Sequence, residues 1–208
     1  MASSTDGFSK TVVVATGNRG KLAEIRSALD FEGWRFVSMN ELDETWPSPE
    51  EDGDTFEANA RIKARAAFER FGMAALADDS GLEVDALGGE PGVYSARYAG
   101  PCADDAENNR RLLLALQDEQ APRTARFRSV IVFVDDDGTE TVAQGACEGE
   151  IAFAPAGDGG FGYDPLFRPA ATPGRAMAEL SMEQKNAISH RGNALRALHD
   201  LLAGTGED

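Results

Sequence analysis

Apolar residues in the first part of the chain form short continuous runs that lead into segments with helical spacing. The run at residues 11–16 is rich in β-branched side chains and ends in the glycine-containing segment 17–21. Leu22, Ile25 and Leu29 then recur at helical spacing. This pattern predicts a strand, a glycine turn and a helix.

A second strand is predicted at residues 34–39, and a longer helix is predicted after an acidic segment. Asp54 and Glu57 have the spacing of a capping box, the usual start of a helix. The apolar stripe that follows consists of Ala60, Ala64, Ala67 and Phe71. These positions predict a helix of roughly four turns that ends at Gly72.

The segment Met73–Ala77 predicts a buried strand that ends where two adjacent carboxylates begin. Asp78 and Asp79 would repel each other there unless a positive group compensates them. One interpretation is an Asx-type turn, in which both side chains accept backbone N–H groups and Gly81 takes a positive φ. The other interpretation is a functional carboxylate pair at the end of a strand.

The second half of the chain shows the same mixture of elements. Residues 104–117 have a helical pattern, Asp137 and Gly138 form a turn between two β-rich segments, and Ser181 with Gln184 forms a second capping box. The last helical segment carries Leu195, Leu198 and Leu202 on one face. Helices interleaved with strands predict an α/β fold with a mixed sheet covered by helices.

The charge of the chain limits its partners. The 208 residues contain 20 Lys and Arg against 36 Asp and Glu, a net charge of −16. Such an excess opposes binding to nucleic acid polymers and to anionic membrane surfaces. An anionic substrate would therefore need a local cationic pocket or a bound metal.

Other features favour a single domain in a reducing compartment. The length fits one domain, predicted over residues 10–208, after a disordered tail at 1–9 that has no signal-peptide character. Cys102 and Cys147 are read as free thiols, and two histidines are too few for a Cys/His metal cluster. No apolar run has the length of a membrane span, so we expect a cytoplasmic protein.

The glycine turn after the first strand is a candidate phosphate site. It consists of Thr16, Gly17, Asn18, Arg19, Gly20 and Lys21. Backbone N–H groups at a helix start attract phosphate, and Lys21 adds a full charge. A helix start with a solvated lysine is the alternative.

The carboxylate pair is a candidate metal site. Because strand ends in open α/β sheets face the ligand crevice, Asp79 and the phosphate loop would share one cleft. Mg²⁺ prefers oxygen ligands and bridges carboxylates to phosphates. The acidic segment 40–54 offers Glu50 and Glu51 as further ligands, although a solvated charge run also explains it.

Two further segments carry candidate binding residues. In the glycine-rich segment 157–167, Phe161 or Tyr163 could stack on a nucleobase, or Phe161, Tyr163 and Phe167 could simply cover the sheet. Lys185, His190 and Arg191 place cations beside a glycine that interrupts a helical pattern. A plain amphipathic helix with surface basic residues is the alternative there.

Taken together, the chain resembles the inosine triphosphate pyrophosphatase family, of the bacterial dITP/XTP type. The matching segments run in family order from residue 11 to about residue 203: TGNRGKLAEI, TFEANARIKAR, ADDSGLEVDALGGEPGVYSARYAG, GGFGYDPLF and EQKNAISHRGNAL. The resemblance implies an elongated mixed sheet with two lobes and a central cleft, and a homodimer. It also implies Mg²⁺-dependent attack of water on the α-phosphorus of XTP, ITP or dITP, which yields the nucleoside monophosphate and pyrophosphate.

The resemblance also assigns roles to residues. Asp79 would be the general base and a Mg²⁺ ligand, with Glu50 as the second ligand and Glu51 as its rival. The substrate would contact Thr16, Gly17, Asn18, Arg19, Gly20, Lys21, Ser80, Phe161, Gly162, Tyr163, Asp164, Lys185, His190 and Arg191. A 6-keto purine would accept from donors at His190 and Arg191, which adenine would leave unpaired. The alternatives are a pyrophosphatase for other modified nucleotides and a nucleotide sensor without turnover.

Overall fold

The structure, a computed structural model, describes residues 8–29, 31–43, 45, 47 and 49–204. Most of the predicted N-terminal tail, residues 1–7, lies outside this part. Ser9 lies inside it and donates its N–H to the carbonyl of Gly33 at 2.7 Å.

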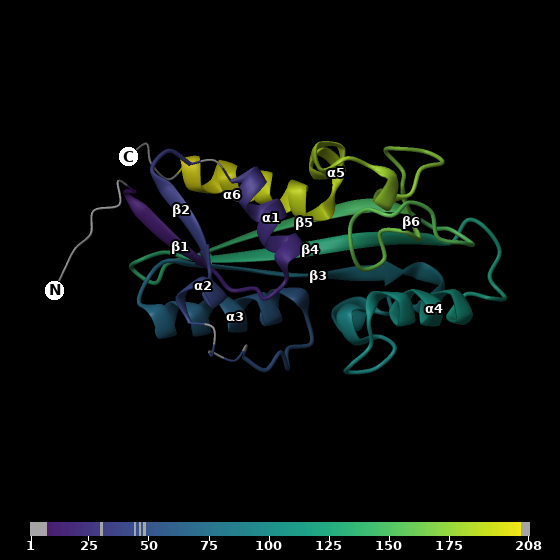
Figure 1. Ribbon diagram of the computed structural model, residues 1–208, viewed down its shortest axis with the longest axis horizontal. Coiled ribbons are helices and arrows are strands. Elements are labelled where there is room, and N and C mark those ends of the chain that lie inside the picture. Colours follow the sequence, from purple (N-terminus) through teal and green to yellow (C-terminus); the bar gives the residue numbers. More distant parts are fainter. Residues whose placement is uncertain (1–7, 30, 44, 46, 48, 205–208) are drawn as a thin grey trace.

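Within the described residues, one mixed sheet runs through the whole molecule (Figure 1). Its strands are β1 (Lys10–Val14), β2 (Trp34–Ser38), β3 (Ala75–Val84), β4 (Thr124–Val134), β5 (Glu140–Ile151) and β6 (Phe167–Pro169). The order is β2-β1-β3-β4-β5-β6. β1 is parallel to β2 and β3, and all other neighbours are antiparallel.

Helices cover both faces of this sheet. They are α1 (Arg19–Ala28), α2 (Met39–Leu42), α3 (Phe56–Phe71), α4 (Asp105–Ala115), α5 (Met182–Ile188) and α6 (His190–Gly204). Short 3-10 turns are η1 (Asp85–Leu87), η2 (Gly92–Arg97) and η3 (Met177–Glu179). Figure 1 shows α1 and α6 on one side of the sheet and α3 on the other. The predicted α/β fold, elongated and mixed with flanking helices, is confirmed.

The hydrophobic core divides between the two ends of the sheet. Near β1 and β2, one cluster joins the sheet to α1 and α6, and a second joins the other face to the alanine stripe of α3. At the far end, Leu112 of α4 and Leu116, which follows that helix, pack with Tyr163, Phe167 and the sheet. A polar region separates these clusters, which gives the molecule two lobes with a cleft between them.

The predicted end of the third strand is wrong. β3 does not stop at Ala77 but continues to Val84, because β4 pairs with it residue by residue from Ala75↔Val134 to Val84↔Ala125. Gly81 has no positive φ, so the Asx-turn interpretation is also wrong. Asp78 and Asp79 lie in mid-strand and therefore point to opposite faces of the sheet.

Local signals elsewhere are mostly confirmed. Ser181 and Gln184 form the predicted capping box of α5, and the β4–β5 hairpin turns at Gly138 with φ 84°. The α3 helix starts one residue later than predicted: Thr55, not Asp54, is its N-cap and accepts the N–H of Ala58.

Two other sequence expectations can be compared with the structure. Both cysteines are unpaired, with Cys102 exposed and Cys147 buried. Among the described residues, no helix is long and apolar enough to cross a membrane.

Candidate active site

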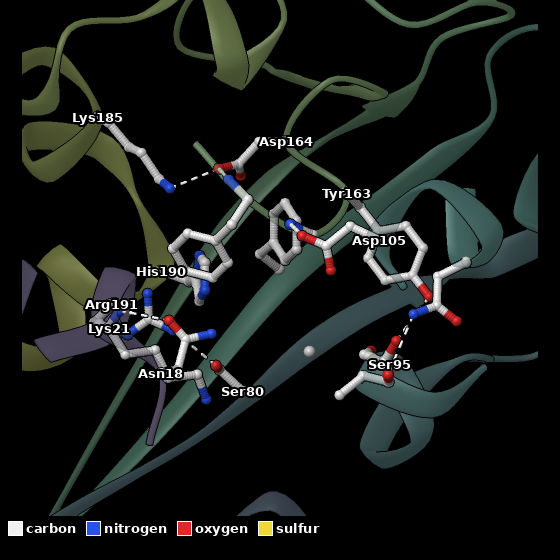
Figure 2. A pocket seen from close by; sticks show the side chains of 16 residues that line it. Asn18, Lys21, Ser80, Ser95, Asp105, Tyr163, Asp164, Lys185, His190 and Arg191 are labelled. Carbon is white, nitrogen blue, oxygen red and sulfur yellow. Dashed lines mark hydrogen bonds and ion pairs between the residues drawn. The ribbon is translucent and has the colours of Figure 1, made fainter. Parts of the chain in front are cut away.

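The cleft lies beyond the end of β1, where, in the part of the chain that the structure describes, β3 continues without a partner strand on that side. β1 pairs with β3 only at Val13↔Ala75 and Val14↔Leu76 in the described sheet, so the next residues of β3 have an open edge on that side. Side chains from both faces of β3 can reach a ligand at this edge. Lys21 of α1, the N-terminus of α6 and the loop 157–164 meet there (Figure 2).

The largest group of predicted residues lines one cavity, which we name the central pocket. Its lining is Asn18, Lys21, Ser80, Gly81, Ser95, Ala96, Asp105, Asn108, Phe127, Phe161, Gly162, Tyr163, Asp164, Lys185, His190 and Arg191. The structure therefore brings together ten of the predicted substrate contacts from four separate segments. Thr16, Gly17 and Arg19 instead border a neighbouring hollow beside Ser38, and Gly20 borders another beneath Phe161.

Asp78 is the centre of a buried ion network on the α1 and α6 face. Its Oδ2 lies 2.9 Å from Lys21 Nζ and 3.1 Å from Arg191 Nη2, and Ser129 donates to its other oxygen. Burial alone would raise the pKa of Asp78, but the charges of Arg191 and Lys21 outweigh it and hold that pKa well below its usual value. Asp78 is thus an ionised anchor that positions two cations.

Asp79 faces α3 and has a different environment. Its Oδ1 lies 2.7 Å from Lys63 Nζ, which also contacts Glu51 Oε2 at 2.9 Å and the Asp78 carbonyl at 3.2 Å. Burial raises the pKa of Asp79 to about 6, despite the nearby charges of Lys63 and Lys21. A carboxylate with this pKa is ionised at neutral pH and still accepts a proton readily.

The contacts of Lys63 show which glutamate of the acidic segment lies near Asp79. Glu51, half-buried, is the glutamate whose side chain approaches Asp79, whereas Glu50 is exposed. The arrangement therefore favours the rival Glu51 over Glu50. Among the described residues, no group of three or more His, Cys, Asp or Glu side chains could hold a metal ion by itself. A cation at Asp79 and Glu51 would therefore need further ligands from substrate phosphates.

The predicted phosphate loop leads into the start of α1. Asn18 is the N-cap of α1 and accepts the N–H of Lys21 at 3.0 Å. Burial, with the charges of Arg191 and Lys63, lowers the pKa of Lys21, although Asp78 acts in the opposite direction. Lys21, Lys63 and Arg191 place three cationic side chains at the open edge of β3, each paired with an aspartate.

The 157–164 loop forms another wall of the central pocket. Asp164 Oδ2 accepts Lys185 Nζ at 2.7 Å and the N–H of Phe161 at 3.0 Å. The Phe161 ring lies 4.5 Å from Lys185 Nζ, and a Cβ on Gly20 would stand 2.8 Å from that ring. Gly20 therefore serves close packing under Phe161.

The aromatic residues of this segment were predicted either to stack on a base or to cover the sheet, and the structure shows both environments. Tyr163 and Phe167 belong to the buried core, and the Tyr163 hydroxyl donates to the carbonyl of Ser95 at 2.9 Å. Phe161 is outside that core and lines the pocket. One ring is thus placed to stack on a ligand, while the other two cover the sheet.

His190 and Arg191 begin α6 directly after the break that follows α5. His190 is buried and stacks on Phe127 with ring centroids 4.7 Å apart. Burial and the Arg191 charge lower the pKa of His190 well below its usual value, so its ring is neutral. Its Nδ1 is buried with no hydrogen-bond partner within the described part of the chain.

The comparison with known proteins agrees with this geometry. A sequence model of the Ham1 family matches residues 12–201. The chain belongs to the Ham1 family. The predicted family resemblance is therefore confirmed.

Several relatives of this Ham1 family protein have the same named activity. The dITP/XTP pyrophosphatases of Desulforamulus reducens and Geobacter sulfurreducens are each 50% identical to it, over 92% and 94% of this chain and 94% and 98% of theirs. The chain spans 61% of the length of the dITP/XTP pyrophosphatase of Streptococcus pyogenes, with 46% identity.

Solved structures of family members have the same fold. The Ham1 protein of Staphylococcus aureus has a TM-score of 0.82 at 42% identity and covers 94% of this chain and 100% of its own. The HAM1 protein of Coxiella burnetii has a TM-score of 0.82 at 44% identity, with 94% and 99% coverage.

Sequence reasoning missed several members of the site in this Ham1 family protein. Lys63 had a visible signal: with Asn59 it lies on the same helical face as the buried alanines Ala60 and Ala64, where a lysine needs partners. Glu24 had a weaker signal beside Ile25; it is 2% exposed and lies 2.9 Å from Lys185 Nζ. The remaining missed lining residues are Gly81, Ser95, Ala96, Asp105, Asn108 and Phe127.

Proposed function

We propose that the protein hydrolyses the deaminated purine nucleoside triphosphates XTP, ITP and dITP to nucleoside monophosphate and pyrophosphate. One observation carries this proposal: a pocket with a stacking ring and a buried carboxylate pair meet at the open edge of β3, with cations between them. Relatives that are half identical over nearly their whole length are dITP/XTP pyrophosphatases.

The protein side chains divide the reaction between them. Lys21 attracts the polyphosphate, and the Asp79 carboxylate orients a water molecule and accepts its proton. Lys63 holds Asp79 and Glu51 together against their mutual repulsion. We propose that Asp79 and Glu51 hold Mg²⁺, which when bound would neutralise phosphate charge and acidify water.

Base selection follows from the pocket wall at the start of α6. A 6-keto oxygen can accept from donors at His190 and Arg191, whereas a 6-amino group would leave them unpaired. Guanine shares the 6-keto group, and xanthine and guanine both carry a substituent of similar size at C2. A steric block at C2 therefore cannot separate XTP from GTP; hydrogen-bond polarity at C2 has to do so.

A panel of triphosphates tests the function. We expect fast pyrophosphate release from ITP, XTP and dITP with Mg²⁺, and little from ATP, GTP or dUTP. Equal rates with ATP would refute the base-selection argument. A preference for dUTP would support the alternative pyrophosphatase for other nucleotides, and binding without release would support the sensor.

We also propose that the protein is a cytoplasmic homodimer. The outward face of β5 supports the dimer: Gln144, Ala146 and Glu148 are exposed there, while Ala143 and Cys147 on the other face are buried. Light scattering on the purified chain should give twice the monomer mass. A monomer that retains full activity would count against this part of the proposal.

A further inference from the structure

One wall of the central pocket has no regular secondary structure of its own. The 157–164 loop contains neither helix nor strand, and Gly162 at its tip has a φ of 61°. Such a segment keeps a fixed shape only through contacts with surrounding elements. Its contact on the α5 side is the bond between Asp164 and Lys185.

On the opposite side, α4 binds the loop through the backbone of Gly162. Asp105 Oδ2 accepts the N–H of Gly162 at 2.6 Å, and Asn109 Nδ2 donates to the Gly162 carbonyl at 2.8 Å. Asp105 and Asn109 are four residues apart, so both lie on one face of the helix. Gly162 stands between Phe161 and Tyr163, and these bonds therefore hold the backbone that carries both rings.

Asp105 is not needed to cap its own helix. Asp104 is the N-cap of α4 and accepts the N–H of Glu107 at 2.8 Å, while the Glu107 side chain accepts the N–H of Asp104 at 2.9 Å. Asp105 is exposed in the first turn, where the helix dipole favours a charged carboxylate. Its bond to Gly162 is therefore charge-assisted and among the stronger kinds of hydrogen bond.

We propose that Asp105 and Asn109 are positioning residues that fix Phe161 as the stacking face for the base. This inference rests on the proposed function, because it concerns the same pocket. α5 and α6 carry Lys185, His190 and Arg191, and α4 belongs to the other lobe. The bonds from α4 thus hold the 157–164 loop at a fixed position in the cleft. This position sets the affinity for the base, and the bonds themselves do not contact the phosphates.

The test compares kinetics with ITP for variants that remove or keep each hydrogen bond to Gly162. Asp105→Ala and Asn109→Asp should each raise KM about tenfold with kcat within about twofold, because each removes one hydrogen bond to Gly162. Asp105→Asn should raise KM clearly less than Asp105→Ala, since its amide oxygen still accepts the N–H but without the charge. Arg110→Ala, exposed on the same helix, is the control and should change neither parameter.

Product inhibition separates positioning from a general loss of structure. In Asp105→Ala and Asn109→Asp, the inhibition constant for IMP, which carries a base, should rise about as much as KM. The inhibition constant for pyrophosphate should not change. Thermal unfolding of each variant shows that the comparison is made on folded protein.

The outcomes are distinct. If the parent protein releases no pyrophosphate from ITP, the proposed function fails. If the parent is active but Asp105→Ala and Asn109→Asp leave KM unchanged, the positioning role is refuted. It is also refuted if Asp105→Asn is as impaired as Asp105→Ala, or if IMP and pyrophosphate inhibition weaken equally.

Discussion

At the scale of single residues, the two adjacent aspartates have separate tasks because strand geometry sends them to opposite faces of the sheet. Asp78 is fully buried among Arg191, Lys21 and Ser129, and the two cations compensate its charge. Asp79 keeps a raised pKa and faces Lys63. Neighbours in sequence therefore act as a structural anchor and as the candidate base.

Asparagine substitutions should separate these tasks. Asp79→Asn should abolish turnover while the protein stays folded, because the amide cannot accept the proton of water. Asp78→Asn should lower the free energy of unfolding by about 3–5 kcal/mol, since it removes the counter-charge of Lys21 and one of the two carboxylates paired with the buried Arg191. Pyrophosphate release and chemical unfolding measure the two effects. Equal loss of stability in both variants would contradict the division of roles.

The raised pKa of Asp79 also predicts how stability depends on pH. In the folded state that pKa is about 6 against an ordinary value of 3.8, so the folded protein binds this proton more tightly than the unfolded chain. The resulting stabilisation is complete below pH 3.8 and is lost as pH rises through about 6. Asp78 acts oppositely: its contribution is present above its ordinary pKa and is lost as the solution becomes strongly acidic.

Thermal unfolding in EDTA tests this expectation. Moving from about pH 7.5 to about pH 5 should stabilise the parent protein relative to Asp79→Asn, which lacks the titrating group. A stability difference between the two proteins that stays constant over this range would contradict the raised pKa.

At the scale of elements, the site depends on close approach between α5 and α6. The break between them follows Ser189, which accepts the N–H of Gly192 at 3.0 Å. A Cβ on Gly192 would stand 1.9 Å from the carbonyl oxygen of Asn186. The glycine noted in the sequence thus permits a tight junction that places Lys185, His190 and Arg191 around one pocket.

Two glycine substitutions in α6 should have opposite effects. Gly192→Ala should destabilise the protein by about 1–3 kcal/mol and reduce activity, because the junction must open to fit the methyl group. Gly204→Ala, at the open end of the same helix with no atom near its added Cβ, should be neutral or stabilising by up to about 1 kcal/mol. Unfolding curves for both variants check this; equal effects would exclude the steric explanation.

At the scale of the whole molecule, the central pocket joins two separately packed ends. Lys21, His190 and Arg191 come from elements beside the first cores, and Asp105 and Tyr163 come from elements around the far core. The net charge of −16 makes the cations at this boundary a local exception. A bound nucleotide would contact both lobes and stabilise their arrangement.

Ligand-dependent unfolding of Asp79→Asn tests this coupling without turnover. ITP at about 100 times its dissociation constant should add about 2.7 kcal/mol to the free energy of unfolding. ATP at the same concentration should add much less. Equal shifts with ITP and ATP would show that the phosphates alone are recognised.

The sequence alone determined what depends on neighbouring residues. The strands β1 and β2, the hairpin at Gly138, the capping box of Ser181 and the Asn18–Lys21 helix start follow from local periodicity and turn chemistry, so they could be predicted. The family motifs then identified most of the pocket lining. The locally predicted elements agree with the structure because the interactions that form them span only a few positions along the chain.

Tertiary structure decided the rest. β3 continues past Asp78 only because β4, some fifty residues away, supplies partners along its whole length. Other features likewise depend on which distant segments become neighbours. They are the approach of Glu51 rather than Glu50 to Asp79, the burial of Lys63 and the bonds from α4 to Gly162. Charge compensation and backbone pairing act through space, and a local pattern carries no record of the partner that will be there.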